Sequence, residues 1–393
     1  MLYNVLVNIE IMNNQRFTQL FNKGRETLIQ WKPQAEKTTE AAFDVIDFFC
    51  CGGGMSLGFA SLKNYFHTLG GVDINSTSLK TYELNHGTPV LNADITTISP
   101  KSNVIQRTFK LDSKRPLVII GCAPCQGFSA HRKKDGDKPE DERNTLIGYF
   151  ADIAVNLNPD FVVMENVPEI LTGKYKNHYE EANKVFTQNG YYVVQRVYNA
   201  AGFGVPQARN RAIIVASKYP DFVLPDEILA EKEYKTVRDA IADLPHVDPR
   251  HQTALTDRYH RCSTHKQSTV DVIAQVPHDG GSRPKGVGPK CLDKVNGFSD
   301  VYGRLSWDKP AITITQYARN PASGRYSHPE QDRGLTIREA ARLQSFPDGY
   351  QWNGSLGDNF KQIGEAVPPL LALAIATQIA LTIKKQENNE QNI

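Results

Sequence analysis

The chain has 393 residues, of which 40% are hydrophobic and 22% charged, and its formal net charge is +2. This is the composition of an ordinary globular protein, and at about 150 residues per domain the length predicts two or three domains. Because the charge is nearly balanced, any nucleic-acid binding must come from local basic patches rather than from a global field.

Cysteine content and terminal sequence indicate the compartment. Six cysteines are too few for a disulfide scaffold. The N-terminal stretch MLYNVLVNIEIMNNQRF carries polar residues early and has no small-residue cleavage site, which argues against a secretory signal. The longest apolar run, residues 370–383, is too short and too interrupted to span a bilayer. We therefore expect a cytoplasmic protein with no membrane partner.

The predicted elements begin with a polar segment, residues 1–42, which is expected to be an appended helical extension. Short apolar runs then predict strands at 43–49, ending near 70–76, and at 115–121, 159–167, 191–200 and 211–217. Helical patterns at 78–86 and 145–157 lie between them. Strands that alternate with helices predict an α/β fold with a doubly wound, mostly parallel sheet.

The character of the sequence changes after Ser217, where Pro, His, Asp, Gly and Lys become frequent and periodicity weakens. A smaller, loop-rich domain is therefore expected, and helical signals return at 336–346 and 370–383. The predicted organisation is an N-terminal extension (1–42), a catalytic domain (43–218), a second domain (219–334) and a C-terminal segment (335–393) that returns to the catalytic domain.

A glycine turn follows the first predicted strand, in the stretch CCGGGMSLG. Glycines there let the backbone approach a ligand closely, and Asp73, at the end of the next strand, is placed to bind the two hydroxyls of a ribose. The pattern is not G-x-G-x-x-G, so it favours a nucleoside over a dinucleotide. By the same reasoning, Asp94 could accept a hydrogen bond from an adenine amino group. Such a residue is more often a helix N-cap or turn residue.

The third predicted strand runs into GCAPCQG, where Cys122 and Cys125 have C-x-x-C spacing. The pair could be a redox dithiol, half of a zinc site with Cys262, His265 and Cys291, or one nucleophile beside a bystander. No common zinc spacing fits those partners. A thiolate at Cys125 would sit in a rigid loop at the carboxyl edge of the sheet, where it is a nucleophile.

Glu165 ends the next predicted strand, and a carboxylate there is costly if buried without a partner, which favours a role in a site. Arg209 and Arg211 alternate at period two, so they are expected to point to one face and to clamp an anion or a carboxylate. For any one of these residues alone, a solvated ion pair is the simpler interpretation.

Taken in order, these stretches resemble the DNA cytosine-5 methyltransferase family over residues 43–217 and 303–374. The resemblance rests on DFFCCGGGMSLGF, GCAPCQGFS, ENV, QARNR, HPEQDRGLTIREAARLQSFPDGY and IGEAVPP. It implies a class I methyltransferase fold, S-adenosylmethionine as cofactor and double-stranded DNA as substrate. Six motifs in the right order make a chance match very improbable.

The resemblance implies that Cys125 attacks C6 of a cytosine flipped out of its duplex while Glu165 contacts the ring. Arg209 and Arg211 would support this pocket, with Arg211 nearer Glu165. The implied cofactor residues are Phe49, Cys51, Gly53, Gly54, Asp73, Ile74, Asp94, Pro124, Leu146, Glu365, Ala366 and Val367. The implied substrate residues are Gln126, Ser129, Asn166, Arg304 and Thr313, and no metal is expected. Residues 129–144 match the family's mobile loop, and 219–334 occupy the place of its target-recognition domain.

Three positions depart from the family pattern: Cys51 and Ala123 replace a glycine and a proline, and Glu365 replaces an asparagine near the sulfonium end of the cofactor. Glu365 would therefore pair with the sulfonium, alter which cofactor analogue fits, or face solvent without effect. Cys122 is expected to face away from the site, so that Cys122→Ala stays active.

The partners expected are double-stranded DNA and a cognate restriction endonuclease acting on the same site, with a monomeric enzyme. The alternatives are a transfer-RNA cytosine-5 methyltransferase, a catalytically silent DNA-binding relative, and a C-x-x-C oxidoreductase. The large insert at 219–334 favours DNA, because a domain that reads bases needs that surface.

Overall fold

The computed structural model describes residues 2–33, 41–124, 145–248, 256–294 and 300–390. Within them, seven strands form one sheet in the order β3-β2-β1-β4-β5-β7-β6. The strands are β1 (Phe43–Phe48), β2 (Phe66–Asp73), β3 (Val90–Asn92), β4 (Leu117–Gly121), β5 (Phe161–Asn166), β6 (Tyr192–Asn199) and β7 (Asn210–Ser217). β1 to β5 pair in parallel, whereas β7 runs antiparallel to both β5 and β6. The predicted α/β sheet is confirmed.

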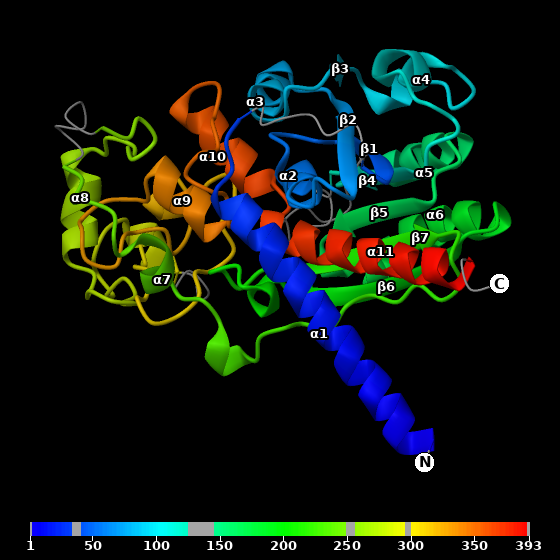
Figure 1. The fold of residues 1–393 in the computed structure, drawn as a ribbon. Coiled ribbons are helices and arrows are strands. Elements are labelled where there is room, and N and C mark those ends of the chain that lie inside the picture. The colour runs from blue at the N-terminus through cyan, green and yellow to red at the C-terminus, as the bar shows by residue number, and fades with distance from the viewer. Residues whose placement is uncertain (1, 34–40, 125–144, 249–255, 295–299, 391–393) are drawn as a thin grey trace.

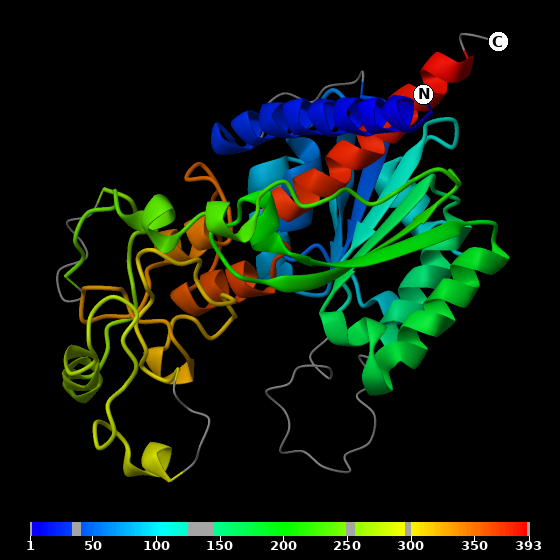
Figure 2. The same ribbon diagram turned by 90° about the horizontal axis from the view of Figure 1, so that it is seen from below.

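Both faces of the sheet are buried, because alternate residues of each central strand enter different cores. Val118 and Ile120 of β4 belong to one core, and Ile119 belongs to the other. Near-continuous apolar strands such as LVIIG are typical of this arrangement. Figure 2 shows α1 and α11 on one side of the sheet and α5 and α6 on the other.

The helices are α1 (Leu2–Ile29), α2 (Gly54–Ala60), α3 (Ser76–His86), α4 (Val104–Phe109), α5 (Leu146–Asn156), α6 (Lys176–Gln188), α7 (Val237–Ile241), α8 (Gln267–Ala274), α9 (Ile337–Leu343), α10 (Leu356–Glu365) and α11 (Pro369–Glu390). Side chains of α1, α2 and α11 share the first core, and those of α4, α5 and α6 share the second. The helical extension expected at the N-terminus is therefore present, and it packs on the body of the protein.

Strand order reverses between β1 and β4, since β2 and β3 lie on one side of that pair and β5 lies on the other. In open α/β sheets, ligands bind at the carboxyl ends of the strands beside such a switch point. The glycine turn follows β1 there, and the segment that leads to Cys125 follows β4. Topology thus brings the two sequence motifs to one edge.

A second lobe of short helices and irregular chain lies to the left of the sheet in Figure 1 and contains α7, α8 and α9. A third core joins Val237, Leu305 and Ile337. Its central ion pair joins Arg333 to Glu339 at 2.7 Å, with both side chains almost fully buried. Desolvation opposes ionisation of Glu339, but the Arg333 charge outweighs it and lowers the pKa of that carboxyl to about 2. This lobe therefore has an interior of its own.

The C-terminal apolar stretch is longer than expected from the sequence. Residues 356–383, which span α10 and the first part of α11, are long and apolar enough to cross a membrane by length and composition, whereas the run considered from the sequence was 370–383 alone. However, 83% of the most apolar window is buried inside the protein. Leu371, Leu373 and Ile375 of α11 pack in the first core, which accounts for the apolar composition.

Candidate active site

Cys122 and Glu165 meet at the carboxyl edge of the sheet. Gly121 of β4 pairs with Met164 of β5, so the next residue on each strand lies side by side. The Cys122 thiol donates to Oε2 of Glu165 across 2.8 Å. The expectation that Cys122 faces away is therefore wrong. Cys125, Gln126 and Ser129 lie outside the described residues.

Glu165 is 3% exposed and forms an ion pair with Arg211, whose Nε lies 2.8 Å from Oε1. Arg211 also donates through Nη1 to the carbonyl of Asn210, 2.7 Å away. A buried carboxylate needs such a partner, because leaving it unpaired costs several kcal/mol. As expected, Arg211 lies beside Glu165, and each carboxylate oxygen has its own neighbour.

Arg209 is also buried, but it is turned toward a different set of partners. Its guanidinium donates to the carbonyls of Ile314, Gly364 and Ala366 at 3.0–3.3 Å. It thus ties the start of β7 to the second lobe and to the end of α10. The expectation that both arginines clamp one anion does not describe this geometry, since Arg211 is the one that contacts Glu165.

Asn166 and Thr313 hold backbone near the same edge. The Asn166 amide donates to the carbonyl of Ala123 at 3.3 Å, and its oxygen accepts from the amide of Val167. Thr313 is half-buried and donates to the carbonyl of Ala208 at 3.0 Å, which bridges the two lobes. Both residues therefore lie at the junction of the sheet edge and the second lobe.

Arg304 is fully buried, so the expectation that it contacts the substrate is wrong. Its guanidinium donates to the carbonyls of Ile273, Val276, His328 and Gln331 and to the carboxylate of Asp332. An arginine engaged in this way organises the interior of the second lobe. The sequence does not reveal this, because the segments that surround Arg304 are irregular and lack periodicity.

The glycine turn after β1 has an unusual backbone. Phe49, Cys51 and Gly53 have φ values of 54°, 47° and 88°. The left-handed conformation costs a residue other than glycine about 1–2 kcal/mol, which explains why glycine is usual at the position of Cys51. The Cys51 sulfur finds room 3.8 Å from the carbonyl of Gln362, and burial raises the pKa of this thiol.

Asp73 holds this turn in place. Its Oδ2 accepts from the amide of Cys51 at 2.9 Å, and Oδ1 accepts from the amide of Asn75 at 2.8 Å. Each carboxylate oxygen can accept a second hydrogen bond, so these bonds leave capacity for a ligand hydroxyl. Beside it, Ile74 is 68% exposed, which is unusual for an aliphatic side chain at a strand end.

Asp94 is exposed and caps a short 3-10 helix, because its Oδ1 accepts from the amide and hydroxyl of Thr96. Both bonds use the same oxygen. The simpler of the two expectations, an N-cap, is thus present. Leu146 and Pro124 are partly buried and border the same sheet edge.

Glu365 is the last residue of α10 and is partly buried. Burial raises the pKa of its carboxyl to about 7; Lys361 partly offsets this, and the Asp73 charge adds to it. Glu365 therefore lies close enough to Asp73 and Cys51 to affect their ionisation, and it does not simply face solvent. Ala366 and Val367, which follow it, are buried, and a Cβ on Gly54 would come within 2.6 Å of the Val367 carbonyl.

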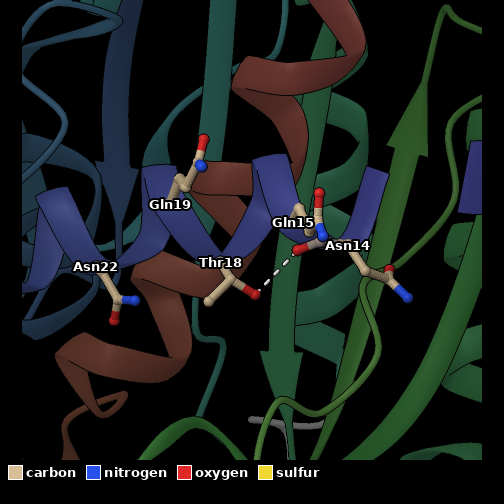
Figure 3. A pocket seen from close by; sticks show the side chains of 5 residues that line it. All are labelled: Asn14, Gln15, Thr18, Gln19 and Asn22. Carbon is tan, nitrogen blue, oxygen red and sulfur yellow. Dashed lines mark hydrogen bonds between the residues drawn. The ribbon is translucent and has the colours of Figure 1, made fainter. Parts of the chain in front are cut away.

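A surface pocket also lies on α1 (Figure 3). Its described lining consists of Asn14, Gln15, Thr18, Gln19 and Asn22. These side chains are all uncharged and polar, and none comes from a strand end. The pocket therefore has no part in the arrangement around Glu165.

The family model for C-5 cytosine-specific DNA methylases matches residues 43–381. The chain belongs to this family. Type II methyltransferase M1.HphI of Haemophilus parahaemolyticus is 35% identical over 336 residues, which cover 85% of this chain and 86% of that protein. Type II methylase M.HgiDII of Herpetosiphon aurantiacus is 32% identical over 85% of this chain and 94% of its own.

Solved structures agree on the fold. A prophage-encoded DNA modification methyltransferase from E. coli superposes with a TM-score of 0.66 at 24% identity, over 87% of this chain and 99% of that one. As a C-5 cytosine DNA methylase, this chain is a DNA cytosine-5 methyltransferase by family. The methylase fold explains why the glycine turn and residues 121–124 share one edge of the sheet.

Sequence reasoning missed two residues of this methylase, His86 and Tyr350, and the contact that Cys122 makes with Glu165. His86 and Tyr350 reach the carbonyls of the glycine turn from α3 and from the second lobe. Their positions within YELNH and FPDGY gave no chemical signal, since a lone His or Tyr is usually a packing residue. The Cys122 contact depends on strand register, which the sequence alone does not give.

Proposed function

We propose that this methylase transfers a methyl group to C5 of a cytosine flipped out of double-stranded DNA, through a covalent bond between Cys125 and C6. The observation that supports it most is Glu165, a carboxylate that is 3% exposed and paired with Arg211 at the strand end beside the segment leading to Cys125. A buried carboxylate held in place by an arginine can accept a hydrogen bond from the exocyclic amine of a flipped base and pass a proton to its ring nitrogen.

In the proposed reaction the Cys125 thiolate attacks C6, Glu165 accepts a hydrogen bond from the exocyclic amine, and N3 takes up a proton through the Glu165 carboxyl, which neutralises the negative charge that develops there. C5 then becomes nucleophilic and takes the methyl group. A base removes the C5 proton, and Cys125 leaves as a thiolate. Arg211 keeps the Glu165 carboxylate in place throughout. Gln126, Ser129, Asn166 and Thr313 are proposed to lie near the flipped nucleotide.

The residues around the glycine turn fit S-adenosylmethionine, which supplies an electrophilic methyl group when it is bound. Asp73 has hydrogen-bonding capacity for a ribose, and the exposed side chain of Ile74 offers an apolar surface for a purine. Phe49, Cys51, Gly53, Gly54, Asp94, Pro124, Leu146, Glu365, Ala366 and Val367 complete the proposed cofactor site.

The relatives are named type II methyltransferases, and we extend that to this chain as a proposal. A cognate restriction endonuclease would cut the same DNA site in its unmethylated form. The region 219–334 would read that site through the major groove, where all four base pairs differ. We propose a monomer that acts in the cytoplasm.

Covalent trapping tests this function. Duplexes of random sequence that contain 5-fluorocytosine, incubated with S-adenosylmethionine, should give a denaturation-resistant protein–DNA complex, because fluorine replaces the proton that must leave. Cys125→Ser should abolish the complex, whereas Cys291→Ser, a matched change at an exposed cysteine, should preserve it. No complex with wild type, or a complex that survives Cys125→Ser, would contradict the proposal. A complex with transfer RNA alone would favour an RNA substrate.

A further inference from the structure

The N-terminal helix α1 lies outside the family match, which begins at residue 43, yet it is packed into the protein. Phe17, Phe21 and Leu28 are buried in the first core. A Cβ on Gly24 would lie 2.5 Å from a methyl carbon of Leu373, so the helix approaches α11 as closely as a glycine permits. The helix therefore has a fixed position relative to α11.

Trp31, two residues beyond the end of this helix, reaches the second lobe and α3. The ring of Trp31 lies 5.7 Å from that of His86, and Trp31 packs against the third core. The carbonyl oxygen of Trp31 would be 2.0 Å from a Cβ on Gly349, so only glycine fits at position 349 with the extension in place. Trp31 is thus wedged between His86 and the residue before Tyr350.

His86 and Tyr350 each contact a backbone carbonyl of the glycine turn. Nε2 of His86 lies 3.2 Å from the carbonyl of Gly53, and the Tyr350 hydroxyl donates to the carbonyl of Gly52. Burial lowers the pKa of His86 to about 4, so the ring is neutral near pH 7 and the tautomer with its proton on Nε2 is the donor. A Cβ on Gly53 would lie 2.5 Å from Nε2, which leaves the turn no room to move toward His86.

The same turn is held from its other end by Asp73, which accepts from the amide of Cys51. Two carbonyls and one amide of three consecutive residues, 51–53, are therefore fixed by side chains from β2, α3 and the second lobe. If His86 or Tyr350 shifts, the turn shifts against Asp73, the residue proposed to bind the ribose. Positioning of this kind acts on ligand affinity, because a preorganised site avoids an ordering cost on binding.

We propose that the N-terminal segment is a positioning element of the cofactor site, in which the Trp31 ring packs beside His86 and the Trp31 backbone abuts Gly349, so that His86 and Tyr350 stay against the carbonyls of the glycine turn. This inference rests on the proposed function, since it assumes that the turn binds S-adenosylmethionine. It assigns a role to a segment that lies outside the family match.

The test compares Trp31→Ala, Trp31→Phe and Phe186→Leu in the full-length protein. Phe186 is buried under the opposite face of the sheet, so its truncation controls for general loss of stability. By isothermal titration calorimetry, Trp31→Ala should raise the Kd for S-adenosylmethionine about ten-fold, the loss expected for one net hydrogen bond. Trp31→Phe should restore most of the affinity, Phe186→Leu should leave it within about two-fold, and KM for the cofactor should change more than kcat.

A second measurement does not depend on the cofactor. Hydrogen exchange of a peptide covering residues 49–54 should quicken in Trp31→Ala and stay at the wild-type rate in Phe186→Leu. Unchanged Kd and exchange in Trp31→Ala, or equal effects in Phe186→Leu, would overturn the inference. If wild type does not bind S-adenosylmethionine but exchange still quickens, the assigned cofactor fails while the mechanical role of Trp31 stands.

Discussion

At the scale of single residues, the contact between Cys122 and Glu165 changes the interpretation of the C-x-x-C pair. The Cys122 thiol lies 2.8 Å from the buried carboxylate of Glu165, so Cys122 belongs to the same site as Glu165. Nevertheless, Arg211 holds the other oxygen of Glu165 independently. The attacking role assigned to Cys125 and the supporting contact of Cys122 are thus separable.

We predict that Cys122→Ala remains active but loses about three- to ten-fold in kcat/KM, because Glu165 loses one hydrogen bond worth about 1 kcal/mol. Initial rates of methyl transfer to DNA measure this. Cys262→Ala, a change at a buried cysteine of the second lobe, serves as the matched control. A Cys122→Ala variant as inactive as Cys125→Ser would reopen the dithiol interpretation.

The raised pKa of Glu365 predicts that the free energy of unfolding depends on pH. Burial first of all raises its pKa from 4.5 to about 7, so ionising it costs the folded protein up to about 3 kcal/mol. Below about pH 4.5 the carboxyl is protonated in both the folded and the unfolded protein, so Glu365 costs no stability there. As pH rises through about 7 the free energy of unfolding falls by this cost. Glu365→Gln should therefore be more stable than wild type at pH 8 and similar to it at pH 4.5.

Urea unfolding at several pH values measures this difference. Asp47, whose pKa burial raises to about 8, titrates in the same window but is present in both proteins, so the comparison isolates Glu365. Glu83→Gln, on the exposed side of α3, is the control and should follow wild type. Parallel curves for Glu365→Gln and wild type would show that Glu365 is not desolvated.

At the scale of elements, Arg209 joins three pieces of chain: the start of β7, the segment at Ile314 and the end of α10. Lysine has its three donors on one nitrogen and cannot match bonds that are divided between Nη1 and Nη2, so Arg209→Lys should lower the free energy of unfolding by about 2–4 kcal/mol. Arg196→Lys, at an exposed ion pair with Asp226, should change it by less than about 0.5 kcal/mol. Chemical denaturation separates the two, and equal small effects would contradict the bridging role.

Strands were predictable where the sequence contains a short, nearly continuous apolar run. The runs that contain β1, β4, β5 and β7 are apolar because both faces of the sheet are covered, so their sequences alone indicate strands. The antiparallel direction of β7 was not predictable, since it depends on pairing with distant strands. Arg304 was misassigned for a related reason: its guanidinium bonds to the end of α8 and to irregular chain at 276 and 328–332, and the sequence does not show that these segments meet.

At the scale of the whole molecule, one sheet edge gathers the residues of both proposed half-sites. Glu165 and Arg211 lie at the ends of β5 and β7, and Asp73 lies at the end of β2. The second lobe and the N-terminal helix meet this edge through Arg209 and Trp31. Side-chain contacts thus connect the two proposed half-sites to the second lobe.

The most direct test of the central claim is bisulfite sequencing of genomic DNA from a host that lacks cytosine methylation and expresses this chain. We expect 5-methylcytosine at one short, recurrent sequence with wild type, and none with Cys125→Ser. Unmethylated genomic DNA with folded, expressed wild-type protein, or methylation that persists in Cys125→Ser, would contradict it.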